Sequence, residues 1–292
     1  MYFGTGLVKT ADDFGTQGEL PSHPELLDWP ACEFRSHWDI KQIQRLIVTS
    51  ATYRQSSRST PEVTNRYPEN RLLSRMTRLR LPAELLRDQA LTVAGLLDRR
   101  IGGPSIRIYQ PDEYWEELTA RRDSDRFSSS QFRLSTGPDL YRRSLYVFWK
   151  RTAPPPTLAI FDALVRETCT IRRSRTNTPL QALVLLNDPT YVEAARKLAE
   201  RVLSEAGPSV EERIVFAFKT CLSRLPIEQE LTILRRLLVA QYTRFRNEPK
   251  AAMALLSVGQ LASNKGHDPT ELATWTVLAR AILNLDEMVT RN

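Results

Sequence analysis

The chain has 292 residues, of which 41% are hydrophobic and 26% charged, which is typical of a globular protein with a sizeable core. No apolar run approaches the roughly 20 residues needed to cross a bilayer, so we expect no membrane span. Arginine supplies 34 of the 41 basic residues behind the net charge of +7, and the planar guanidinium suits carboxylates, phosphates and sulfates. Because these residues are scattered among 34 acidic ones, the charge indicates either a solvated surface or an anion site and argues against nucleic acid.

The N-terminal half reads as short helices separated by irregular segments. A glycine-containing loop over residues 1–20 is followed by a capping-box pattern at Ser22, which predicts a helix that Pro30 should kink or end. A second helix is predicted to begin at Asp39, and a stronger one at Pro82. Apolar stripes mark the buried faces of these two helices: Ile40, Ile43, Ile47 and Ala51 in the first, and Leu86, Ala90, Val93 and Leu97 in the second.

The middle of the chain changes character before a long helical half. Residues 103–143 are polar and weakly periodic, as expected of an exposed connection or insertion. Residues 144–150, "SLYVFWK", are the strand candidate, because β-branched and aromatic residues are bounded there by arginines and prolines. Beyond them the apolar periodicity, with prolines at helix starts, predicts helices near 156–164, 179–187, 189–206, 210–223, 226–246, 250–258 and 270–287.

These elements predict a mainly α protein in which an irregular N-terminal half, with at most a short strand pair, packs on a C-terminal array of helices. We treat residues 1–292 as one family domain. Its subregions are 1–151, mixed helix and loop with a strand near 144–150, and 152–292, which is helical.

The stretch from residue 171 to residue 189, "IRRSRTNTPLQALVLLNDP", is the strongest candidate for a site. Thr178, Pro179 and Gln181 form a capping box at the start of an apolar helix that we expect to be buried. The free N–H groups of a helix start, beside Arg172, Arg173 and Arg175, form an arrangement that receives anions. The predicted anion-binding residues are therefore Arg172, Arg173, Arg175 and Thr178.

An alternative interpretation makes these arginines structural, paired with Asp162 or Glu167 inside the fold. Asp162, Cys169 and Gln181 are accessory candidates, since positive charge near Cys169 would lower the pKa of its thiol. A lone cysteine beside a buried helix is also commonly a small hydrophobe. No spacing of carboxylates selects an acid/base pair, so catalytic residues stay unassigned and the residues do not decide whether the chain is an enzyme.

Cysteine and histidine are too sparse to suggest a metal or haem site. The three cysteines are far apart and form no C-x-x-C motif, so the sequence lacks the haem attachment motif C-x-x-C-H. The three histidines are also separated by long intervals, so we expect neither a metal nor a cofactor bound to this chain.

Several stretches taken together resemble a known family, the planctomycete cytochrome-c-associated C-terminal domain, a domain of unknown function. The resemblance runs over nearly the whole chain, from "FGTGLVKTADDFGTQGELPSHPELLDW" through "YRRSLYVFWKRTAPPP" and "CTIRRSRTNTPLQALVLLNDPTYVEAARKLAERV" to "LARAILNLDEMVTRN". Two positions depart from the family pattern. Leu164 and Val165 replace a Pro-Asp pair, which removes a carboxylate near Arg172, and Pro30 replaces a leucine.

The resemblance implies the C-terminal part of a larger protein of the periplasm or cell envelope, with haem c only on a module outside this chain. That origin would also account for the abrupt N-terminus, where we see no signal peptide. The implied partners are the cytochrome c and other modules of the same protein, and a sulfatase-like protein or anionic polysaccharide. Two functions follow: a non-haem binding module, or an enzyme acting on sulfated polysaccharide with carboxylate or cysteine chemistry.

Overall fold

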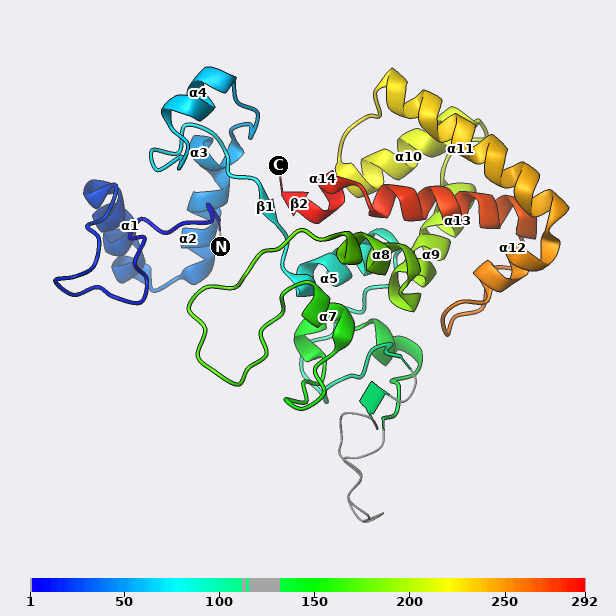
Figure 1. Ribbon diagram of the computed structural model, residues 1–292, viewed down its shortest axis with the longest axis horizontal. Coiled ribbons are helices and arrows are strands. Elements are labelled where there is room, and N and C mark those ends of the chain that lie inside the picture. The colour runs from blue at the N-terminus through cyan, green and yellow to red at the C-terminus, as the bar shows by residue number, and fades with distance from the viewer. Residues whose placement is uncertain (1, 112–113, 116–131, 292) are drawn as a thin grey trace, which may run out of the picture. The chain divides into compact units, whose positions relative to one another are not determined.

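The structure, a computed structural model, describes residues 2–111, 114–115 and 132–291, and within them it is mainly helical, as predicted (Figure 1). The chain divides into two compact units. The N-terminal unit comprises Met1–Leu79 with Thr290–Asn292, and the C-terminal unit comprises Arg80–Val289. The sheet among the described residues consists of two strands, β1 (Leu79–Arg80) and β2 (Thr290–Arg291), which agrees with the expectation of at most a short strand pair, although the sequence predicted a strand elsewhere. None of the described helices is both long enough and apolar enough to cross a membrane.

Four short helices build the N-terminal unit: α1 (Pro24–His37), α2 (Ile40–Thr49), α3 (Ala51–Arg54) and α4 (Pro61–Arg66). Helix α2 begins where predicted, because the Asp39 carboxylate accepts hydrogen bonds from the backbone N–H groups of Lys41 (2.8 Å) and Gln42 (3.1 Å). The sequence predicted that Pro30 would kink or end the first helix. The helix does not end there, because α1 continues to His37. A proline removes one backbone hydrogen bond, and the other bonds along α1 carry the helix past it.

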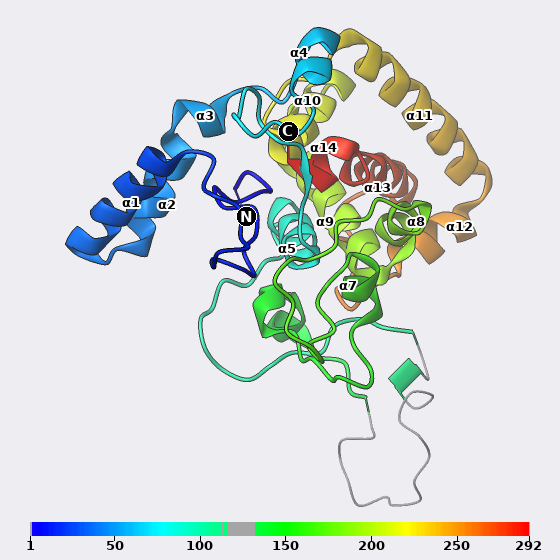
Figure 2. The same cartoon turned by 60° about the vertical axis from the view of Figure 1, so that its left-hand side comes forward.

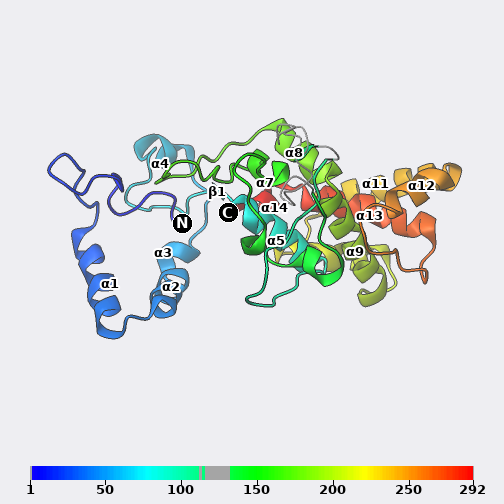
Figure 3. The same ribbon diagram turned by 90° about the horizontal axis from the view of Figure 1, so that it is seen from below.

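Helices α9 (Pro189–Glu205) and α13 (Pro269–Leu283) form the centre of the C-terminal unit and pack directly on each other (Figures 1 and 3). Alanines on α9 allow the close approach: Ala195 and Ala199 are fully buried in the cluster that also contains the apolar side chains of α13. Around this pair lie α5 (Ala83–Val93), α10 (Val210–Leu222), α11 (Glu228–Asn247), α12 (Pro249–Leu256) and α14 (Asp286–Val289). Figure 2 shows α10, α11 and α12 surrounding α13. The predicted helices from 179 onward are confirmed to within a few residues.

The strand predicted at residues 144–150 is wrong. Ser144–Tyr146 forms a 3-10 turn, followed by isolated bridges between Val147 and Ile106 and between Lys150 and Ala153. The backbone N–H of Ile106 donates to the carbonyl of Tyr146 (2.8 Å), and the carbonyl of Ile106 accepts from the N–H of Phe148 (2.7 Å). These two hydrogen bonds pair the backbone at one position only and do not form a β-strand. Of the apolar side chains that suggested a strand, Val147 packs in the core at 7% exposed, whereas Leu145 is 77% exposed.

The expectation of an exposed connection over residues 103–143 is only partly correct for its described flanks, and most of its polar middle lies outside the described residues. Residues 103–105 and 136–139 are exposed. Ile106 and Leu140 are almost fully buried. Arg87 of α5 holds this region by donating to the carbonyl oxygens of Leu140 (2.6 Å) and Arg142 (2.9 Å). Burial lowers the pKa of this guanidinium, but its backbone partners satisfy both terminal nitrogens.

Candidate functional site

A long loop of the C-terminal unit carries the arginines singled out by the sequence. It connects α7 (Pro156–Ile160) to α8 (Pro179–Asn187), and Figure 1 shows it as a wide green excursion between these two helices. Every residue from 165 to 180 is exposed. This segment holds four arginines, Arg166, Arg172, Arg173 and Arg175, against one acidic residue, Glu167. The predicted binding residues Arg172, Arg173, Arg175 and Thr178 therefore all lie on one solvent-facing segment, which we call the arginine loop (residues 165–180).

Asp162 closes the base of the arginine loop. Its carboxylate accepts hydrogen bonds from the backbone N–H of Thr176 (2.7 Å) and from the Thr176 hydroxyl (3.0 Å), and it forms an ion pair with Arg80. Burial alone would raise the pKa of Asp162, but these hydrogen bonds and the charge of Arg80 together lower it. The residue also adopts a left-handed backbone conformation (φ 58°), in which aspartate is tolerated better than most residues.

Arg80 is the functional neighbour that sequence reasoning missed. Its side chain is only 7% exposed, and besides Asp162 it donates to the carbonyl oxygens of Thr176 (2.7 Å), Phe161 (3.2 Å) and Leu81 (3.1 Å). One buried guanidinium thus joins both ends of the loop. The available signal was an arginine between two leucines in "RLRLP", which suggests a charge carried into an apolar environment.

Arg173 is paired with Glu84, and not with Asp162 or Glu167, the two partners considered from the sequence. Its Nη1 lies 2.8 Å from Oε2 and 3.0 Å from Oε1 of Glu84, on α5. The two side chains are 38% and 26% exposed, so this ion pair lies at the surface and not in the core. Asp162, the partner suggested earlier for Arg173, is instead bound to Arg80.

Helix α8 begins with the predicted capping box, but it is less buried than predicted. Gln181 is 3% exposed, and its Oε1 accepts from the backbone N–H of Thr178 (3.4 Å). Its Nε2 donates to Ile160 (3.0 Å) and to the Thr176 hydroxyl (3.0 Å), so Gln181 connects the helix start to the loop base. Leu180 and Leu183 are 53% and 54% exposed, because only the side of α8 that carries Gln181 and Leu185 faces the core.

Cys169 lies in the arginine loop as an exposed free thiol. The interpretation of this cysteine as a small buried hydrophobe is therefore wrong. Among the described residues, no group of three or more His, Cys, Asp or Glu side chains is arranged to hold a metal ion.

The opposite end of α8 borders a cavity of about 840 Å³ in the C-terminal unit. Leu183, Val184 and Asn187 of α8 form one side of it. Aromatic side chains form another part of the wall, with Tyr109, Trp115 and Phe132 among the lining residues. Apolar and aromatic walls with a few polar groups are the usual lining of ligand sites.

A buried network of charges supports one wall of this cavity. Glu193 of α9, only 1% exposed, accepts hydrogen bonds from the hydroxyls of Tyr109 (3.0 Å) and Tyr141 (3.0 Å) and from the backbone N–H of Leu261 (2.8 Å). Burial, followed by the charge of Glu193, raises the pKa of both tyrosines, so the hydroxyls stay protonated donors. The network therefore fixes the position of the Tyr109 ring.

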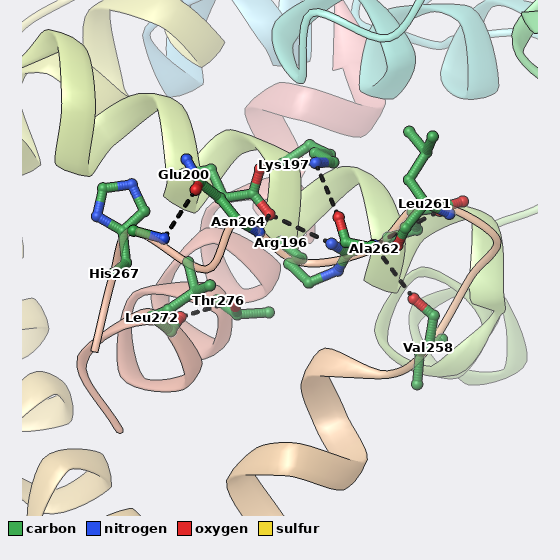
Figure 4. A network of polar contacts seen from close by, with 12 residues as sticks. Arg196, Lys197, Glu200, Val258, Leu261, Ala262, Asn264, His267, Leu272 and Thr276 are labelled. Carbon is green, nitrogen blue, oxygen red and sulfur yellow. Dashed lines mark hydrogen bonds and ion pairs between the residues drawn. The ribbon is translucent and has the colours of Figure 1, made fainter. Parts of the chain in front are cut away.

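One turn along α9, the network continues through Arg196 to Glu200, and Figure 4 shows how the loop after α12 wraps these side chains. Arg196 is fully buried and donates to Glu200 Oε1 (3.2 Å) and to the Leu261 carbonyl (2.6 Å). Lys197 reaches the other Glu200 oxygen (2.7 Å), and the backbone N–H of Asn264 donates to Oε1 (3.1 Å). These contacts hold a loop to a helix, and they leave the carboxylates occupied.

The fold and the loop together define a mainly helical protein with an exposed cationic segment closed by a buried arginine–aspartate pair. The model of the family described as PSD1, a protein of unknown function (DUF1553), matches residues 1–238, and the chain belongs to this family. Neither the curated proteins nor the solved structures contain a match to the chain.

Proposed function

We propose that this chain is a binding module for an anionic polymer, and that the arginine loop is its contact surface. In the context implied by the family resemblance, the module forms part of a larger protein of the periplasm or cell envelope that carries a c-type cytochrome elsewhere. Sulfated polysaccharide is the ligand we favour, and a sulfatase-like protein is the corresponding protein partner.

The observation that carries this proposal is the exposure of four arginines on a segment with one acidic residue. Guanidinium groups bind sulfate through paired N–H donors, and exposed cations retain their attraction for a polyanion. The base of the loop is held by Arg80, Asp162 and Thr176, so its ends are fixed before a ligand arrives. Pre-organisation of this kind lowers the entropy that binding would otherwise cost.

The ion pair between Arg173 and Glu84 is one that Arg173 can exchange for a pair with a ligand anion. Since both side chains are partly exposed, the pair contributes little to stability, about 0–1 kcal/mol. A sulfate group can replace the Glu84 carboxylate at Arg173 without leaving a buried charge unpaired. The pair is therefore compatible with binding, in contrast to the buried pair of Arg80 and Asp162.

Helix α8 extends the contact surface from the arginine loop to a cavity with aromatic walls. Its nine residues span about 13 Å at 1.5 Å per residue. The helix joins the end of the arginine loop to the cavity lined by Tyr109, Trp115 and Phe132. An oligosaccharide could place sulfates at the loop and the apolar face of a sugar ring at the cavity.

Carboxylate or cysteine catalysis on the same polymer receives less support. The Asp162 carboxylate is occupied by Thr176 and Arg80, and its lowered pKa makes it a poor proton donor near neutral pH. Cys169 is an exposed free thiol on a loop whose residues 165–180 are all exposed, so it lies in no enclosed site of the kind that shields a nucleophile from water. Binding is therefore the function we favour over catalysis.

Affinity measurements with dextran sulfate and neutral dextran test this proposal. We expect the chain to bind dextran sulfate alone, with an affinity that falls as salt is added. Replacing Arg172, Arg173 and Arg175 by glutamine should abolish binding, whereas the control Arg236→Gln, at an exposed position on α11, should lose little. Equal losses in both variants, or equal binding of neutral dextran, would refute a role for the loop.

A further inference from the structure

The N-terminal unit exposes an unusual amount of apolar surface for its size. Among its described residues, 2–79 and 290–291, only Asn70 and Met76 are buried. Trp38, Ile40 and Trp29 are 72%, 63% and 51% exposed. A unit of this size normally hides its large apolar side chains in a core, so this surface represents hydrophobic free energy that the unit does not recover by itself.

Part of that surface, the side chains of Leu26 and Trp29, lines a cavity of about 670 Å³ inside the unit. Helices α1 and α2 lie side by side in all three overall views (Figures 1–3) and provide two of its walls. The wall residues follow helical spacing: Leu26 and Trp29 on α1, and Ile43, Leu46 and Ile47 on α2. Leu26 and Trp29 remain 45% and 51% exposed, so apolar area is available for a guest.

A tight turn around Leu73 completes the wall, and its backbone adopts a conformation that leucine rarely takes. Leu73 lines the cavity in a left-handed conformation (φ 52°), which is costly for a leucine. The turn is held by Asn70, whose Nδ2 donates to the carbonyl of Arg75 (2.7 Å), and by Gln55, whose Nε2 donates to the carbonyl of Leu73 (2.6 Å). The fold therefore tolerates a strained backbone at Leu73, whose apolar side chain lies at this cavity.

Charges gather at one part of the lining. Lys9, Arg71 and Glu69 are the charged residues among those that line the cavity, and Glu19 lies beside both cations. Lys9 lies 3.7 Å from Glu69 and 4.0 Å from Glu19, and Arg71 lies 3.2 Å from Glu19. Lys9 and Arg71 are 42% and 44% exposed, which leaves their heads accessible to a negatively charged group.

We propose that this cavity binds a single-chain amphiphile with an anionic head, of the chemical class of a fatty carboxylate. The hydrocarbon chain lies between α1 and α2 against Leu26, Trp29 and Leu46, and the carboxylate lies near Lys9 and Arg71. Burial of the chain recovers the free energy of the exposed Leu26 and Trp29 side chains. The ligand carboxylate replaces Glu19 as the partner of the half-exposed Lys9 and Arg71, which a neutral analogue does not do. This site is independent of the arginine loop.

Binding of 11-(dansylamino)undecanoic acid to the full 292-residue chain tests the proposal, with dansyl emission followed by direct excitation. We expect saturable binding at one site and displacement by laurate. Leu46→Trp fills the cavity and should weaken binding by at least about tenfold, which corresponds to about 1.4 kcal/mol. Val48→Trp adds the same bulk to α2 at a position outside the lining and should leave binding within about twofold of the parent.

The head group has its own test, which does not depend on tolerance of a bulky substitution. Lys9 is 42% exposed, so Lys9→Gln preserves the fold. The dissociation constants of the probe and of laurate should both rise about threefold in this variant, whereas that of dodecanol, obtained from competition corrected for the probe's own affinity, should stay unchanged. Equal losses in the two tryptophan variants, non-saturable binding, or no probe binding would overturn the site. Dimerisation through this face in sedimentation, without probe binding, would also overturn it and assign the cavity to a second copy of the chain.

Discussion

Arg173 and Glu84 form an ion pair between positions 89 residues apart, with Arg173 Nη1 lying 2.8 Å from Glu84 Oε2. The pair joins the exposed arginine loop to α5, and its partly exposed geometry separates two kinds of arginine in this protein. Arg173 is held loosely enough to exchange partners, whereas Arg80 is enclosed by backbone carbonyls and Asp162. In the function proposed above, Arg173 exchanges Glu84 for the ligand, and Arg80 fixes the loop.

Substitution of Arg173 should therefore affect ligand binding more than folding. We expect Arg173→Gln to change the free energy of unfolding by no more than about 1 kcal/mol, as for other surface ion pairs. Sulfate should raise the melting temperature of the parent chain by mass action, and less in the variant. Thermal unfolding with and without sodium sulfate, at constant ionic strength, measures both quantities. A loss of 3–5 kcal/mol, as expected of a buried pair broken on one side, would contradict the surface geometry.

The buried pair should behave in the opposite way. We expect Arg80→Met to destabilise the chain by about 3 kcal/mol, since it leaves the Asp162 carboxylate partly buried without its charge partner. Urea unfolding provides the measurement, and Arg236→Met on the exposed surface of α11 is the matched control. Equal effects of the two substitutions would show that Arg80 does not hold the loop.

Asp162 also predicts a pH dependence. Its pKa is lowered in the folded state, so its contribution to stability is complete above the unfolded-state pKa of about 3.9 and is lost as the pH falls through the folded-state value. Asp162→Asn should therefore be less stable than the parent near neutral pH, and the difference should shrink in acid. Urea unfolding between about pH 2 and pH 6 tests this expectation. A difference that stays constant with pH would mean that Asp162 acts without its charge.

The helices of the C-terminal unit could be predicted from sequence because their signals are local. Thr178 with Gln181 and Asp188 with Pro189 specify helix starts within a few residues, and the structure places α8 and α9 there. The arginine loop was likewise evident from its composition. Its anchors were not, because Arg80 and Asp162 are 82 residues apart and only the fold brings them together.

Burial was harder to predict than secondary structure. The apolar residues of α8 suggested a buried helix, but which side meets the core depends on partners such as α9 that one segment does not specify. The same limit applied to residues 144–150, which suggested a strand although Val147 forms one isolated bridge with Ile106 and Leu145 is 77% exposed. The stripe predicted for α2 is wrong at both ends, since Ile40 is 63% exposed and Ala51 lies in α3. Its middle residues, Ile43 and Ile47, line a cavity that the sequence did not show.

The absence of a C-x-x-C-H motif from the sequence predicts that this chain attaches no haem covalently. Protein produced in cells that mature c-type cytochromes should lack a Soret band and should show no haem staining after denaturing electrophoresis. A c-type cytochrome expressed in parallel is the positive control. Haem recovered on the denatured chain would refute the assignment of haem to another module.

The last prediction concerns Gly259, which has a positive φ of 95° beside the buried network of Glu193. A Cβ atom at this position would overlap the Glu193 side chain, whereas one at Gly102, with a φ of 82°, would meet no atom within 4 Å. Gly102→Ala should therefore cost only the left-handed backbone strain, roughly 1–2 kcal/mol. Gly259→Ala should cost at least about 2 kcal/mol more, because it displaces a carboxylate that accepts from two tyrosines and a backbone amide. Urea unfolding of the two variants measures the difference. Equal losses in the free energy of unfolding would mean that the Glu193 side chain moves aside without destabilising the protein.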